Sequence, residues 1–230
     1  MMRAMTHVPA ADPAPPTLVV FDIGGVLIRH HRAWAPACRA VGLPVPENVD
    51  EPSFLAARRR LHHLFGIGEI DEDAFYAGMA SADTQRLYTP ADIRRLHEGW
   101  LLDEYAGVAS LLASLRRAAR ARTATLSNTN AGHWRQMNAL PDSRSRYASL
   151  THIEHLHASH LLRAAKPDAL IYERFEVAMN AKPHEILFFD DLKENIAAAS
   201  SRGWRTVLVD HTQETEPQIR AALIAHRLLD

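Results

Sequence analysis

Three short, largely apolar runs that each end at a polar residue place the strongest constraint on the fold of this 230-residue chain. They are residues 18–21 before Asp22, residues 123–126 before Ser127, and residues 186–189 before Asp190. Continuous apolar runs of this length are typical of strands buried on both faces, as in a parallel sheet. A fourth run, residues 206–209, ends at Asp210. The sequence therefore predicts a parallel sheet with polar side chains at the carboxyl ends of its strands.

Helical patterns lie between these runs. Residues 108–115 place Val and Leu side chains on one face of a helix. A second pattern follows Pro167, has Asp168 in its first turn and ends at Asn180, and a third ends at Gly203. Strands that alternate with helices predict an α/β fold with a Rossmann-like, doubly wound parallel sheet, in which ligands bind beyond the carboxyl ends of the strands.

About 100 residues separate the first two runs, which is more than a simple crossover needs. This stretch has helical features: Thr89, Pro90 and Asp92 offer an N-cap, a proline at N1 and an acid at N3. We expect a flexible tail at residues 1–16, a core of residues 17–29 and 107–230, and an inserted helical cap at residues 30–106.

Charge and composition exclude several classes of protein. Lys and Arg number 26 and Asp and Glu 27, so the net charge of −1 provides no field for nucleic acid or an anionic membrane. The chain has one cysteine, Cys38, and no apolar run long enough to span a membrane. Residues 1–16 lack the apolar segment of a signal peptide, so we expect a cytoplasmic enzyme without nucleic-acid or membrane partners.

Four polar segments carry the residue types that phosphoryl transfer requires. Asp22 precedes two glycines and has the position of a nucleophile, although Asp-x-Gly-Gly is also an ordinary turn. Ser127 and Asn128 offer a phosphate cradle, or else a helix N-cap. Lys166 precedes a proline and has the charge to neutralise a phosphoryl group or the nucleophile, unless it is a surface lysine.

The fourth segment places two adjacent carboxylates, Asp190 and Asp191, at the end of a very apolar strand. Two buried acids repel each other unless a cation or hydrogen bonds compensate for their charge. Mg²⁺ fits such a pair because it binds carboxylates, waters and phosphate oxygens. The alternative is a pair of structural acids that cap a helix.

These segments together resemble the four motifs of the haloacid dehalogenase superfamily. They read FDIGGVL, TLSNTN, AAKPDALIYERF and ILFFDDLKENIAAA, and the likeness spans nearly all of residues 17–210. The runs LSNTN, GEIDEDAF and FFDDLKENI are most similar to the bacterial phosphatases that act on alpha-D-glucose 1-phosphate. The resemblance implies a Rossmann-like core with a small helical cap after the first motif.

The resemblance also implies a role for each matched residue. Asp22 would be the nucleophile, and the backbone carbonyl of Gly24 and the carboxylate of Asp191 would bind Mg²⁺. Asp190 would support a metal-bound water or Lys166, and Asn195 would steady the metal loop. The Ser127 hydroxyl and the Asn128 amide would hold the phosphate.

The pattern is broken at Gly24, where most phosphatases of this superfamily carry a second Asp that protonates the leaving oxygen and activates water. His30 and His31 are candidate substitutes or else solvated hinge histidines. Arg163 stands where relatives tend to have glycine, which predicts a bulkier loop or one that reaches toward the substrate. His133 and Trp134 are candidates for the floor of the cleft or for packing. Four clustered histidines suggest a metal site or a polar loop and helix surface: His152, His155, His157 and His160.

The leading hypothesis is a Mg²⁺-dependent phosphomonoester hydrolase that acts on a small phosphorylated metabolite through an aspartyl-phosphate on Asp22. One alternative is a haloacid dehalogenase, in which Asp22 attacks carbon without a metal. Another is a non-catalytic or weakly catalytic binding protein, which the glycine at position 24 favours. The sequence does not name the substrate, the replacement for the missing acid or the oligomeric state.

Overall fold

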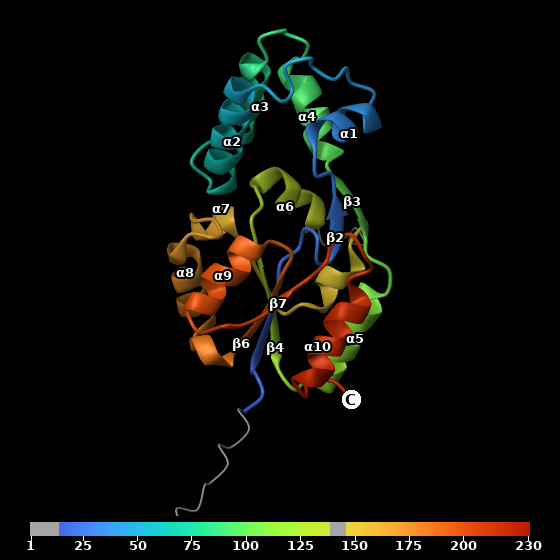
Figure 1. Cartoon of the computed structure of the whole chain (residues 1–230), viewed down its shortest axis with the longest axis vertical. Helices are drawn as coiled ribbons and strands as arrows, with labels where there is room; N and C mark the ends of the chain where they lie inside the picture. The colour runs from blue at the N-terminus through green and yellow to red at the C-terminus, as the bar shows by residue number, and fades with distance from the viewer. Residues whose placement is uncertain (1–13, 139–145) are drawn as a thin grey trace, which may run out of the picture.

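The computed structural model describes residues 14–138 and 146–230, so most of the predicted tail lies outside the described residues. Five parallel strands form one sheet in the order β5-β4-β1-β6-β7 (Figure 1). The strands are β1 Leu18–Phe21, β4 Arg122–Ser127, β5 His155–Ala158, β6 Ile186–Asp190 and β7 Arg205–Leu208. The predicted α/β fold with a Rossmann-like parallel sheet is confirmed.

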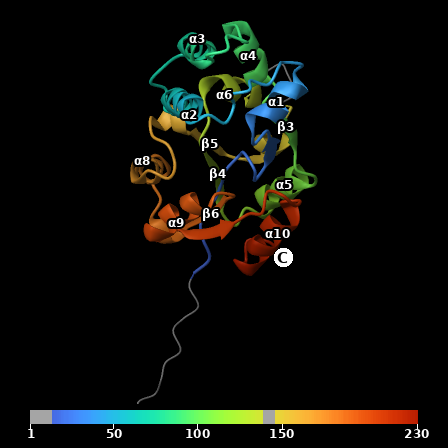
Figure 2. The same ribbon diagram turned by 45° about the horizontal axis from the view of Figure 1, so that its top comes forward.

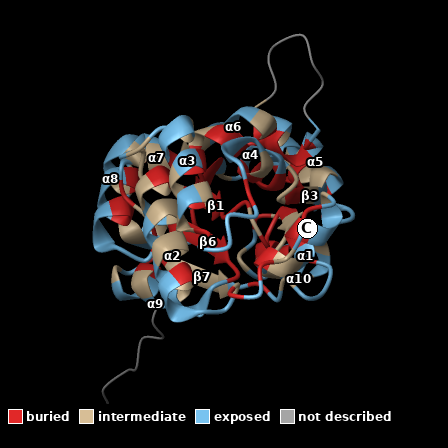
Figure 3. Ribbon diagram, turned by 90° about the horizontal axis from the view of Figure 1, so that it is seen from above, coloured by how far each residue is buried: buried red, intermediate tan, exposed pale blue. Residues whose placement is uncertain are grey.

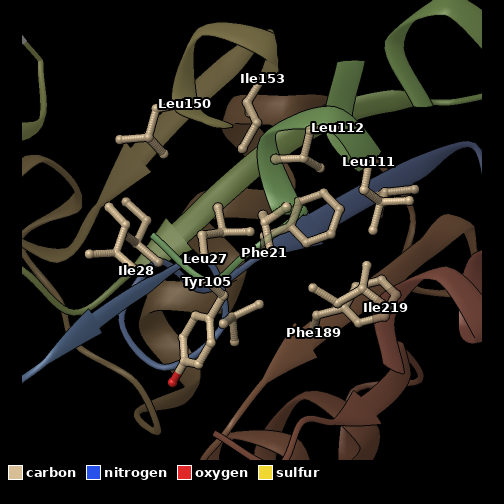
Figure 4. Close-up of a cluster of buried hydrophobic side chains, with 14 of the residues drawn as sticks. Phe21, Leu27, Ile28, Tyr105, Leu111, Leu112, Leu150, Ile153, Phe189 and Ile219 are labelled. Carbon is tan, nitrogen blue, oxygen red and sulfur yellow. The ribbon is translucent and has the colours of Figure 1, made fainter. Parts of the chain in front are cut away.

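Alternate side chains of β1 belong to two different cores, one on each face of the sheet. Val19 and Phe21 pack with α5 (Val108–Ala118) and α10 (Glu216–Ala225), in the cluster drawn in Figure 4. Leu18 and Val20 pack with residues of α8 (Ala169–Met179) and with Ala199 of α9 (Lys193–Ser201). Figure 3 shows β1 and β6 at the buried centre, surrounded by helices with exposed outer faces. Burial on both faces explains the uninterrupted apolar runs.

The predicted helix ends follow the chemistry of the residues there. Asn180 ends α8 with a left-handed φ of 46°, and Gly203 follows α9 with a φ of 92°. Asp168 is the N-cap of α8 and accepts a hydrogen bond from Leu170 N, so it lies just before the first turn in which it was expected. The short helices α6 (Ala131–Met137), α7 (Ser159–Leu162), η1 (Ala148–His152) and η2 (Pro183–Glu185) complete the core.

Four helices form a lobe beyond the carboxyl ends of the strands (Figures 1 and 2). They are α1 Trp34–Ala40, α2 Pro52–Gly66, α3 Glu72–Ala82 and α4 Pro90–Glu98, and they share a core of their own. Thr89 and Asp92 form the expected capping box at the start of α4. Two antiparallel strands, β2 (Ile28–His30) and β3 (Leu101–Glu104), connect this helical lobe to the sheet domain.

The interpretation of residues 155–158 as polar loop or helix surface is wrong, because they form β5. His155 and His157 pair with β4 at the edge of the sheet, where one side of a strand remains free. Backbone pairing with β4 overrides a polar local pattern in this segment. None of the helices in the described part of the chain has the length and apolar character that a bilayer-spanning helix needs.

Candidate active site

Three carboxylates converge at the carboxyl ends of β1 and β6, which are neighbours in the sheet. All three residues are buried, and one carboxylate oxygen from each of Asp22, Asp190 and Asp191 lies within 4.8 Å of the others. Asp22 Oδ1 also accepts a hydrogen bond of 2.7 Å from Ile23 N, which orients the side chain. The chain crosses between the two halves of the sheet at this point, where α/β folds form their ligand sites.

Lys166 is buried beside these acids, which contradicts its interpretation as a surface lysine. Its Nζ lies 3.2 Å from Asp22 Oδ1 and 2.7 Å from Asp190 Oδ2. The backbone of Lys166 is held by two hydrogen bonds of 2.8 Å, because Asn128 Nδ2 donates to its carbonyl and its N–H donates to Asn128 Oδ1. The side chain of Asn128 therefore fixes the lysine relative to the nucleophile candidate.

The two adjacent acids have different partners. Asp190 is fully buried and accepts hydrogen bonds from Lys166, from Asn195 Nδ2 at 3.0 Å to each oxygen, and from Leu192 N at 2.8 Å. Asp191 has other partners: its Oδ2 lies 2.5 Å from Arg32 Nη2 and 3.4 Å from His211 Nδ1. Asp190 therefore positions Lys166, whereas Asp191 pairs with the side chains of Arg32 and His211.

The electrostatics of this cluster suit a bound cation. Burial raises the pKa of Asp22 to about 6, with contributions from the charges of Asp190 and Asp191, although Lys166 and a hydrogen bond from Ser127 oppose the rise. Burial alone would lower the pKa of Lys166, but the carboxylates of Asp190 and Asp22 outweigh it and raise that pKa. Three carboxylates face one ammonium here, and this oxygen-only donor set with excess negative charge fits Mg²⁺.

A cavity of about 470 Å³ opens between the sheet domain and the helical lobe. Ser127, Asn128 and Lys166 line it from the sheet side, and Arg58 and His62 line it from α2. The size lies within the ~300–1,000 Å³ that small-molecule sites typically have. Gly24, Ser127, Asn128 and Lys166 therefore meet at one cavity, and Asp22 precedes its lining residues Ile23 and Gly24 and pairs with Lys166.

His30 also lines the cavity and packs against Gly24. Its Nδ1 donates a 2.8 Å hydrogen bond to the carbonyl of His31, so Nε2 is the nitrogen that remains available in the neutral ring. Burial and the charge of Arg32 lower the pKa of His30 below its usual value. Because β2 carries this histidine back over the first motif, the imidazole lies beside the position where relatives have their second acid.

Two stacked histidines form another part of the wall. The rings of His97 and His133 lie 3.8 Å apart and nearly parallel. Asn130 fixes both tautomers, since its Oδ1 accepts from His133 N and its Nδ2 must therefore donate to His97 Nε2 and His133 Nδ1. His97 then carries its proton on Nδ1, a buried nitrogen for which the described residues offer no hydrogen-bond partner. Burial lowers the pKa of both imidazoles, that of His133 to about 4.

Other candidates lie away from the cavity. His31 and Trp134 are absent from its wall, and Arg163 turns its guanidinium to Glu69 of the helical lobe at 3.4 Å. Arg163 has a left-handed φ of 50°, which accounts for the glycine that relatives tend to have there. Among the described residues, the clustered histidines form no metal-binding group: His157 Nε2 contacts Met179 Sδ, and His160 Nδ1 donates to the carbonyl of Thr129.

Sequence reasoning missed the residues that the helical lobe contributes to the cavity. Arg32, Arg58, His62 and His97 all line it. The sequence could have linked only Arg58 and His62, because a spacing of four residues places them on one face of a helix. Nothing in the sequence indicated which face of that helix would turn toward the sheet.

The chain belongs to the haloacid dehalogenase-like hydrolases, since the family model matches residues 16–203. This match spans the sheet domain from β1 to the end of α9 together with the helical lobe, and it includes every residue of the acid cluster. The enzyme class predicted from the four motifs is therefore confirmed as a hydrolase of this superfamily.

Solved structures share the same fold. A HAD family enzyme from Bacteroides thetaiotaomicron is 23% identical over 90% of this chain and 99% of its own, with a TM-score of 0.72. A HAD-like family hydrolase from Porphyromonas gingivalis is 24% identical over 91% and 98%, with a TM-score of 0.71. The L-2-haloacid dehalogenase from Xanthobacter autotrophicus is 16% identical over 94% and 85%, with a TM-score of 0.59.

Proposed function

We propose that this chain is a Mg²⁺-dependent phosphomonoesterase that forms an aspartyl-phosphate on Asp22. The observation that carries the proposal is the position of Asp22 Oδ1, 3.2 Å from the buried ammonium of Lys166 and within the three-carboxylate cluster. A metal-free dehalogenase has no use for such an acid cluster. A carboxylate nucleophile and a dianionic phosphate ester repel each other. A Mg²⁺ ion held by the acid cluster would supply the positive charge that their reaction needs.

Asp22, Asp191 and the carbonyl of Gly24 would hold the Mg²⁺, while Asp190 keeps Lys166 in place. When bound, the ion would neutralise the phosphoryl oxygens and the nucleophilic carboxylate. Two observations support this assignment: burial and neighbouring acids raise the pKa of Asp22, and the related Bacteroides enzyme has been solved in complex with magnesium and inorganic phosphate. Arg32 lies 2.5 Å from Asp191 and would have to release it for Asp191 to hold the ion.

In the proposed reaction, Asp22 attacks phosphorus and the ester oxygen leaves. The Lys166 ammonium, the Ser127 hydroxyl and the Asn128 backbone amide hold the phosphoryl oxygens as charge develops on them. A water then attacks phosphorus of the aspartyl-phosphate, which releases inorganic phosphate and restores the Asp22 carboxylate. Ser127, Asn128 and Lys166 all line the cavity, which supports this division of labour.

We propose that His30 replaces the acid missing at position 24. Its Nδ1 hydrogen bond to the His31 carbonyl leaves Nε2 with a free lone pair beside Gly24. Nε2 would take the proton of the attacking water in the second step and pass it to solvent, while the ester oxygen that leaves in the first step takes its proton from solvent. Because no carboxylic acid protonates the leaving group in the first step, this arrangement favours esters with good leaving groups.

The helical lobe, with residues 30–106 as its proposed limits, would act as the cap that closes over the substrate. Its side chains line the cavity from above, which supports a role in selecting the alcohol part of the ester. The resemblance to bacterial alpha-D-glucose-1-phosphate phosphatases makes this glycosyl phosphate the first substrate to test. An anomeric phosphate departs more easily than an alkyl phosphate, in agreement with the glycine at position 24.

The test is phosphate release from a panel of phosphomonoesters, measured with Mg²⁺, with chelator, and with the Asp22→Asn variant. The proposal predicts Mg²⁺-dependent release that chelator and Asp22→Asn each abolish. Chelator-resistant release of halide from 2-haloacids would instead establish the dehalogenase. If the folded wild-type protein releases neither product but binds inorganic phosphate, the chain is a binding protein.

A further inference from the structure

The cavity carries more positive charge than one phosphoryl group requires. The described residues that line it include three cationic side chains, Lys166, Arg32 and Arg58, and five histidines, but no carboxylate. A cavity lined in this way favours anionic ligands. The three cations differ in whether a carboxylate already neutralises their charge.

Two of the three cations already have carboxylate partners. Lys166 pairs with Asp22 and Asp190, and Arg32 pairs with Asp191. Arg58 has no ion pair with any described carboxylate, and Asp50 affects its pKa only as a secondary contribution. Burial lowers the pKa of the Arg58 guanidinium and outweighs the opposing effects of Cys38, Asp50 and Tyr88, which reflects the cost of holding a charge in this position. Among the described residues, Arg58 is therefore the cation of the cavity that has no carboxylate partner in the metal-free protein.

Arg58 is also held in a fixed orientation. Its guanidinium carbon lies 4.3 Å above the ring of Trp34 and 5.5 Å from the centre of the Phe54 ring. Its one hydrogen bond among the described residues is long, at 3.5 Å from Nη1 to the carbonyl of Val49, and its buried Nε has no partner there. Aromatic stacking thus positions a guanidinium whose donors are largely unused.

Neighbouring side chains extend the same wall. His62 lies one turn after Arg58 on α2, and both line the cavity. The charge of Arg58, together with burial, lowers the pKa of His62 to about 4, so this imidazole is neutral and offers an N–H donor. His97 adds a buried Nδ1–H without a partner among the described residues. Arg58, His62 and His97 thus line the cavity from the helical lobe, whereas Lys166 lines it from the sheet domain.

We infer that Arg58 and His62 form a subsite for a second anionic group, so that the preferred substrate is a phosphomonoester that also carries a carboxylate or a second phosphate. This inference rests on the proposed function, because it assumes that the first phosphoryl group lies at Asp22 and Lys166. Both kinds of anion accept the fork of hydrogen bonds that a guanidinium offers. A neutral sugar phosphate would leave Arg58 unpaired.

The test compares substrates that share a pyranose ring and an anomeric phosphate. They are alpha-D-glucose 1-phosphate, alpha-D-glucuronic acid 1-phosphate and alpha-D-glucose 1,6-bisphosphate. We expect the anionic pair to have kcat/KM values about 10–100-fold above that of the neutral sugar, mainly through KM. Arg58→Gln should remove this preference, and Arg58→Lys should retain part of it. Arg59→Gln is the matched control, because Arg59 is exposed on the same helix and outside the cavity wall.

A binding measurement separates the subsite from catalysis. Calorimetric titration of the folded Asp22→Asn variant with the same three compounds should give the same order of affinity, and adding Arg58→Gln should equalise them. Equal kcat/KM values and equal affinities in the Arg58-containing proteins would overturn the subsite while leaving the phosphatase intact. Absence of phosphate release from every substrate would overturn the proposed function. The order of the calorimetric affinities would then still show whether Arg58 binds a second anionic group. If the protein prefers the glucuronic acid phosphate to the neutral sugar phosphate but shows no preference for the bisphosphate, the subsite binds a carboxylate and not a second phosphate.

Discussion

The imidazole of His30 occupies the space into which a side chain at position 24 would extend. A Cβ added to Gly24 would lie 3.0 Å from Cδ2 and 3.1 Å from Nε2 of His30. These contacts are tighter than nine in ten real Cβ contacts, so a side chain at position 24 requires His30 to move by a few tenths of an ångström. The glycine and the histidine therefore belong together, and this pairing leads to two predictions.

His30→Ala should lower kcat by about 10–100-fold with little change in KM, because it removes a group that moves a proton but leaves the phosphate cradle intact. Steady-state kinetics on the best substrate of the panel measures the effect. His155→Ala is the control, since His155 is exposed on β5 and distant from the cavity wall. An unchanged kcat in the His30 variant would remove this residue from the mechanism.

Gly24→Asp should not simply restore the usual acid of the superfamily. The new side chain crowds His30 and requires it to shift, and overpacking of this kind costs about 1–3 kcal/mol of unfolding free energy. The double variant Gly24→Asp with His30→Ala should recover that stability and exceed the activity of His30→Ala alone. Urea denaturation and kinetics of the three variants form a double-mutant cycle. If the single Gly24→Asp variant is as stable as wild type, the proposed steric exchange is wrong.

Lys166→Met should destabilise the metal-free protein by about 3–5 kcal/mol, because it leaves Asp22 and Asp190 buried without their shared cation. Urea denaturation at pH 7 measures the loss. Lys193→Met is the matched control, since Lys193 is exposed at the start of α9 and should change stability by less than about 0.5 kcal/mol. Equal stabilities of the two variants would contradict the role of Lys166 as the internal counter-ion.

The raised pKa of Asp22 predicts a specific dependence of stability on pH. Folding moves this pKa from 3.8 to about 6, so the folded state binds more protons than the unfolded state between these values. The contribution of Asp22 to stability is therefore largest below about pH 4 and is lost as the pH rises through 6. Relative to Asp22→Asn, the metal-free wild type should lose about 2–3 kcal/mol of unfolding free energy between pH 4 and pH 7. Parallel pH profiles for the two proteins would contradict the prediction.

The sheet and its polar strand ends were predictable because local sequence determines them. Residues 186–189 are apolar without alternation, and burial on both faces of β6 requires that pattern. The ends of α8 at Asp168 and Asn180 follow from capping chemistry within a few residues. Parallel strands have their carboxyl ends at one edge, so Asp22, Ser127 and Asp190 were expected to lie close together before any coordinates.

The remaining features depend on contacts between distant segments. His155 and His157 form a strand only because β4 offers them a pairing edge. The pairing of Arg32 with Asp191 joins residues 159 positions apart, and no periodicity indicates it. Arg58 lines the cavity because the face of α2 that carries it turns toward the sheet domain. The sequence of α2 is only weakly amphipathic and does not determine which face turns inward.

The central claim is that Asp22 attacks phosphorus, and isotope labelling in a single turnover tests it most directly. The enzyme, in excess over substrate, is allowed one turnover in water enriched in oxygen-18, and the mass of the peptide containing Asp22 is compared with that of the released phosphate. We predict the label in the phosphate and none in Asp22, together with a phosphorylated Asp22 peptide when the turnover is stopped early with acid, because Asp22 and then water attack phosphorus. Absence of the phosphorylated peptide would contradict the role of Asp22. Label in the carboxylate of Asp22 would show attack on an ester carbon and would contradict the phosphatase mechanism.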